Sequence, residues 1–92
     1  MLILDLSNNL IMNNQKKIEL QSATFKRLLE HLDKRKDVQN IDIMNLAGFC
    51  RNCLSRWYQE EAEKKNIQIT NLDAREHIYG MPYSQWKEKH QK

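Results

Sequence analysis

The sequence has few of the residues that build β-rich or membrane-spanning folds. Its 92 residues include two glycines, one proline and one valine, too few turn-forming and β-branched residues for a many-stranded sandwich. The apolar opening MLILDLSNNLIM is interrupted by Asp5, follows no basic residue and falls well short of the roughly 20 residues of a membrane span. We therefore expect an all-helical protein with no signal peptide, membrane anchor or membrane partner.

Neither charge sign dominates, and the supply of core residues is small. Fifteen Lys and Arg residues against 12 Asp and Glu residues give a net charge of +3, which is ordinary for a solvated surface. Leu, Ile, Val and Phe are 22 of 92 residues, and a chain this short buries only about 60% of its unfolded surface. A homodimer or another protein partner is therefore expected to cover remaining apolar surface.

Apolar spacing predicts a compact bundle or array of about four helices. Residues 1–11 lack a charged face opposite their apolar residues, so we interpret them as an N-terminal appendage to one domain over 12–92, with Met12 an alternative start. Helices are expected over about 16–36 and 41–65, for two turns after Thr70, and from Pro82 as the first residue of the last helix. Asn13 or Asn14 suits the first helix start, Thr70 with Asp73 forms a capping box, and Gly80 suits a helix end.

The predicted helix over 41–65 carries the most specific motif. Its apolar stripe is Ile43, Leu46, Ala47, Cys50, Cys53, Leu54, Trp57 and Tyr58, with Arg51 and Asn52 on the polar side. Gly48 falls inside this helix, where glycine costs about 1 kcal/mol relative to alanine, so it suggests the close approach of another backbone. Cys50 is then expected two turns or more inside the helix.

Cys50 and Cys53 are three residues apart, so both sulfurs share one helix face. Such a pair can hold one edge of a zinc or iron site. A tetrahedral site needs two more ligands, from His31, His77, His90 or a second subunit. Simple core packing of both cysteines is the competing interpretation. Redox use is less favoured, because reactive cysteines usually lie at helix N-termini.

Other chemistry has weaker support. The sequence has no catalytic triad order, glycine-rich phosphate loop or dense carboxylate cluster, so an enzyme is not the first expectation. Arg51, Arg56, Trp57 and Tyr58 can stack on RNA, but acidic residues at 60, 61 and 63 follow at once, so nucleic acid is not an expected partner. Two reduced thiols without a secretion signal favour the cytoplasm.

Two blocks, DVQNIDIMNLAGFCRNCLSRWY (37–58) and AREHIYGMPYSQWKEKHQ (74–91), resemble the signature blocks of the domain-of-unknown-function family 1244, short proteobacterial proteins. The resemblance covers essentially residues 12–92 and implies a small all-helical domain.

Polar residues beside the apolar stripes indicate a candidate pocket between the second helix and the YGMPY turn, with walls from Arg51, Asn52, Trp57 and Tyr83 beside the cysteine pair. The leading hypothesis is a non-catalytic binding or interaction module whose thiol pair coordinates a metal. The alternatives are a thiol-dependent enzyme or redox protein using Cys50 or Cys53, and a weak RNA-binding module.

Overall fold

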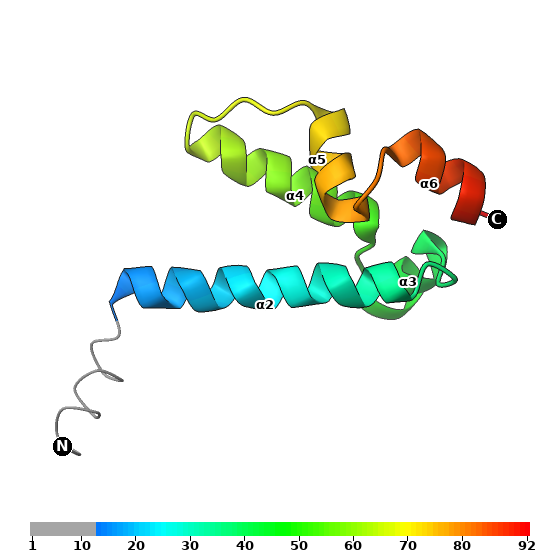
Figure 1. Cartoon of the computed structure of the whole chain (residues 1–92), viewed down its shortest axis with the longest axis horizontal. Coiled ribbons are helices and arrows are strands. Elements are labelled where there is room, and N and C mark those ends of the chain that lie inside the picture. The colour runs from blue at the N-terminus through cyan, green and yellow to red at the C-terminus, as the bar shows by residue number, and fades with distance from the viewer. Residues whose placement is uncertain (1–12) are drawn as a thin grey trace, which may run out of the picture. The chain divides into compact units, whose positions relative to one another are not determined.

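A computed structural model describes residues 13–92, which form helices and no strands (Figure 1). The helices are α2 (Asn14–Lys34), α3 (Asn40–Ala47), α4 (Arg51–Lys64), α5 (Asn71–Tyr79) and α6 (Tyr83–His90). The all-helical prediction is confirmed, but the described residues form five helices where about four were expected. The predicted appendage and the alternative start at Met12 lie outside the described residues.

The chain divides into two compact units, the first ending at His31 and the second beginning at Leu32. One domain from residue 12 onward therefore stays a prediction. Most of α2 belongs to the first unit, and none of its side chains is fully buried: Phe25, Leu28 and Leu29 are half-buried, whereas Ile18 is exposed. No helix in the described part of the chain is long and apolar enough to cross a membrane.

The predicted helix over 41–65 is wrong in one respect, because it is two helices. Gly48 takes the left-handed conformation at φ 75° and ends α3, and its N–H donates to the carbonyl of Met44 at 2.9 Å. A Cβ built at this glycine meets no atom within 4 Å, so the expected close backbone approach is also wrong. Gly48 is suited to its place because it adopts positive φ without steric cost.

The local signals at the other helix ends are largely confirmed. Oδ1 of Asn13 accepts from the Lys16 N–H at 2.9 Å, and the Thr70 hydroxyl accepts from the Asp73 N–H at 3.0 Å in a complete capping box. Gly80 ends α5 with φ 72°. Pro82 precedes the first residue of α6 instead of occupying it. These ends depend on neighbouring residues alone, which is why sequence finds them.

The core of the second unit lies where α4 packs on α5 and α5 packs on α6. Its buried apolar members are Cys50, Cys53, Leu54, Ala74, Ile78, Tyr79 and Trp86. The predicted apolar stripe is only partly buried: Leu46 is 90% exposed and Trp57 is 44% exposed. The break at Gly48 explains the exposure of Leu46, because residues before and after the glycine no longer share one helical periodicity.

Candidate functional site

The cysteine pair lies at the N-terminus of α4. Cys50 is the N-cap residue, with extended backbone at φ −148°, and Cys53 lies in the first turn. The Cys50 carbonyl accepts from the Leu54 N–H at 3.1 Å, the first bond of the helix. The prediction that Cys50 lies two turns inside a helix is therefore wrong, and the argument it supplied against redox use no longer holds.

The two sulfurs are close enough to act together. Sγ of Cys50 lies 3.8 Å from Sγ of Cys53, both thiols are free, and the residues are 7% and 8% exposed. Two sulfurs bound to one tetrahedral zinc ion, each about 2.3 Å from the metal, are themselves about 3.8 Å apart. The pair already has the separation of one edge of such a site.

No third ligand is found beside this pair in the described chain. Residues 13–92 contain no group of three or more His, Cys, Asp or Glu side chains placed to hold a metal. His31, the predicted third ligand, belongs to α2 and to the first unit. His77 stacks on the ring of Tyr58 at 4.4 Å, and His90 lies 5.6 Å from the ring of Trp86. Residues 13–92 of one chain therefore offer two of the four ligand positions.

Arg51 follows Cys50 and is a buried cation, only 2% exposed. Its guanidinium donates to the carbonyls of Val38 at 2.7 Å and Arg35 at 2.9 Å and to Oδ1 of Asn40 at 3.1 Å. It also lies 4.9 Å from the ring centre of Trp86. Burial lowers the pKa of Arg51 from its usual value. No carboxylate in residues 13–92 forms an ion pair with it.

A buried tyrosine links the helices around Arg51. The Tyr79 hydroxyl donates to Oδ1 of Asn52 at 2.6 Å and accepts from Nδ2 of Asn40 at 3.0 Å. Asn40 therefore bonds both Arg51 and Tyr79, joining α3, α4 and α5. Burial is the main cause that raises the pKa of Tyr79 to about 12.

A polar pocket of about 270 Å³ lies beside this network. Its lining residues are Gln39, Asn40, Ile41, Asn52, Tyr83, Gln91 and Lys92. Asn52 and Tyr83, two of the four predicted wall residues, thus come together. Arg51 does not line the pocket but holds Asn40, which does. Trp57 lies elsewhere, 6.2 Å from the ring of Phe49. Gln39 and Asn40 were not among the predicted pocket walls, because the local signal at these two residues is that of a helix start.

A family model described as "Protein of unknown function (DUF1244)" matches residues 38–92. The chain belongs to this family. The match begins at Val38, later than the resemblance from residue 12 suggested, and a search of curated proteins found no match. The cysteine pair, Arg51 and the polar pocket all lie within the DUF1244 segment, whereas His31 lies outside it.

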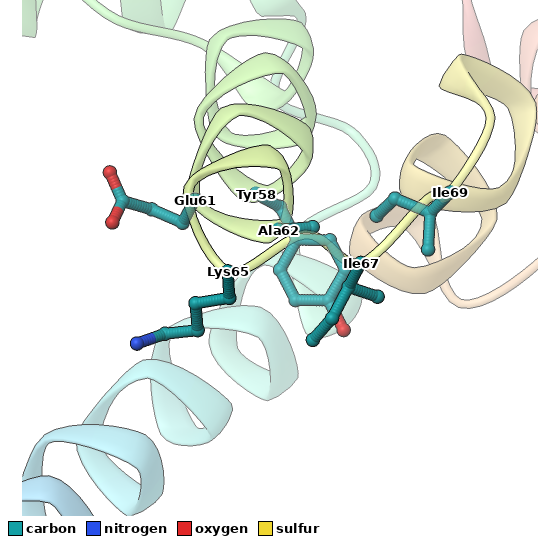
Figure 2. Close-up of a pocket in the computed structure, with 6 residues that line it drawn as sticks. All are labelled: Tyr58, Glu61, Ala62, Lys65, Ile67 and Ile69. Atoms are coloured by element: carbon teal, nitrogen blue, oxygen red, sulfur yellow. The ribbon is translucent and has the colours of Figure 1, made fainter.

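A second, apolar pocket of about 240 Å³ lies in the DUF1244 segment at the end of α4 (Figure 2). Tyr58, Ala62, Ile67 and Ile69 form its apolar walls, and Figure 2 shows the charged ends of Glu61 and Lys65 pointing away from it. Arg56 pairs with Glu60 at 3.9 Å. All four residues considered for RNA stacking, Arg51, Arg56, Trp57 and Tyr58, contact neighbouring side chains. RNA binding stays an untested prediction.

The raised pKa of Tyr79 in the DUF1244 segment predicts a loss of stability in alkali. The unfolded chain loses this proton near pH 10 and the folded chain near pH 12, so the contribution of Tyr79 to stability is full below pH 10 and falls between those values. We expect the loss to be on the order of 2 kcal/mol. Ultraviolet absorbance should show that one of three tyrosines ionises late, and Tyr79→Phe should remove that step. A wild-type titration with all three near pH 10 would contradict this.

Proposed function

We propose that the chain is a non-catalytic binding module whose Cys50 and Cys53 thiolates coordinate a metal ion. The observation that carries the proposal is the 3.8 Å separation of the two sulfurs, because it matches the edge of a tetrahedral thiolate site. Thiolate ligands in this geometry suit zinc or iron, and zinc is the first metal to test.

The similar burial of the two cysteines supports coordination over thiol exchange. Cys50 and Cys53 are 7% and 8% exposed, whereas a redox pair usually has one nucleophilic sulfur that is clearly the more exposed of the two. The proposal places the protein in the cytoplasm, where reducing conditions keep both thiols available for a metal.

The test is zinc retention. Wild-type protein incubated with zinc and dialysed should keep the metal, measured by elemental analysis, and Cys50→Ser or Cys53→Ser should weaken zinc binding more than about 100-fold. Ser55→Ala is the matched control, because Ser55 is buried in the same helix, its hydroxyl donates to the Arg51 carbonyl, and it is not one of the two proposed ligands. His31→Ala tests the predicted third ligand. Folded wild-type protein that keeps no zinc would contradict the proposal.

The position of Cys50 supports redox chemistry as a second candidate function. Reactive cysteines usually lie at helix N-termini, and Cys50 is the N-cap residue of α4. Cys50 would attack a low-molecular-weight disulfide and release one of its thiols, and Cys53 would then attack the mixed disulfide and release the second. The sulfurs would close from 3.8 Å to about 2.05 Å.

The same preparations distinguish the two functions. The redox function predicts that zinc-free wild-type protein in oxidised glutathione gains an internal disulfide, whereas Cys53→Ser stops at the mixed disulfide. It also predicts that the wild-type protein does not retain zinc. Zinc retention with protected thiols supports the binding module.

A further inference from the structure

The cysteine pair is half of a tetrahedral site. A zinc ion held by sulfur takes four ligands, and residues 13–92 supply no third His, Cys, Asp or Glu beside the pair. Resting on the function proposed above, we infer that two copies of this chain share one metal ion, each contributing Cys50 and Cys53. A two-fold axis through the metal ion places the same two cysteines of each copy around it. This symmetry is the simplest way to complete the four ligands.

Charge balance supports a second copy as the source of the missing ligands. One divalent zinc ion with four thiolates carries two net negative charges, and burying them is costly without nearby cations. Arg51 follows Cys50 in each chain, and its buried guanidinium bonds only neutral acceptors among residues 13–92, at Val38, Arg35 and Asn40. Two copies bring two such cations, so the assembled centre is neutral overall. The two cysteines of a single chain do not give this balance of thiolate and guanidinium charges.

Exposed apolar residues surround the cysteine pair in the sequence. Trp57 follows Cys53 by one helical turn on the same face of α4 and lies 6.2 Å from Phe49. Leu46 and Met44, near the end of α3, are also exposed. We call these three exposed residues, together with the half-buried Phe49, the apolar collar: Met44, Leu46, Phe49 and Trp57. Exposed aromatic and aliphatic residues are the expected components of an interface core, and these lie within seven residues of the cysteine pair in the sequence.

The experiment combines native mass spectrometry with sedimentation equilibrium on the full chain. Zinc-loaded wild type is expected to be a dimer with one zinc per two chains, and removing zinc with EDTA should weaken dimerisation at least about tenfold. Leu46→Glu should weaken both dimerisation and zinc binding at least about tenfold. Because Leu46 is almost fully exposed, the variant should fold. Leu72→Glu, at an exposed leucine of α5 outside the collar, is the matched control and should change neither.

The outcomes separate this inference from the function on which it rests. A monomer that holds one zinc per chain overturns the sharing of metal and leaves the binding module intact. A dimer that Leu46→Glu and EDTA do not affect also overturns the sharing. Folded wild-type protein that takes up no zinc overturns both the inference and the proposed function.

Discussion

Replacing Arg51 with alanine is expected to lower the free energy of unfolding by about 3 kcal/mol. The guanidinium donates to three acceptors, the carbonyls of Val38 and Arg35 and Oδ1 of Asn40. Loss of the donor leaves acceptors without partners, at about 1 kcal/mol or more for each one that water cannot reach. The contact with Trp86 is lost as well. Urea unfolding of zinc-free protein, followed by tryptophan fluorescence, measures the change.

Arg56 supplies the matched control on the same helix. Its side chain is exposed and forms a long ion pair with Glu60, so Arg56→Ala should change the free energy of unfolding by less than about 0.5 kcal/mol. Arg51→Lys should fall between the two, because a lysine cannot donate from a planar fork. Equal losses for Arg51→Ala and Arg56→Ala would show that the buried network does not stabilise the fold.

Trp86→Ala should lower the free energy of unfolding at least as much as Arg51→Ala. Trp86 is 1% exposed and meets the Tyr79 ring edge-on, with ring centres 4.9 Å apart. Removing a buried tryptophan costs about 3–5 kcal/mol, which in a domain this small approaches the whole free energy of unfolding. The variant should therefore show largely lost helical signal and an early thermal transition by circular dichroism.

Trp57 provides a same-residue control for this experiment. Because Trp57 is nearly half exposed, Trp57→Ala in zinc-free protein should lower the free energy of unfolding by less than about 1 kcal/mol. If Trp57→Ala were as destabilising as Trp86→Ala, the packing of α6 against α5 would not be the centre of the core.

The parts of the fold that depend on neighbouring residues could be predicted from the sequence. The Thr70 and Asp73 capping box and the left-handed Gly80 each follow from side chains within one turn. Gly48 shows the limit of this reasoning. The apolar spacing resumes after it, so sequence alone does not distinguish an interior glycine from one that ends a helix. Because Gly48 ends a helix, Cys50 lies at a helix start and not in the helix interior that was predicted.

The candidate site was only partly predictable because its partners are distant in sequence. The spacing of Cys50 and Cys53 already indicated a shared face, but not the separation of the sulfurs. Arg51 was placed on the polar side of its helix and is in fact buried, because its acceptors come from the segment at residues 35–40. The bonds by which Asn40 joins Arg51 to Tyr79 were not predicted for the same reason.

X-ray absorption at the zinc edge tests the central claim, that the Cys50 and Cys53 sulfurs bind metal, most directly. Measured on zinc-loaded wild-type protein, the spectrum should show four sulfur ligands at about 2.3 Å. In zinc-loaded Cys53→Ser protein the sulfur signal should fall. A first shell made only of nitrogen and oxygen in the wild-type protein would contradict the account.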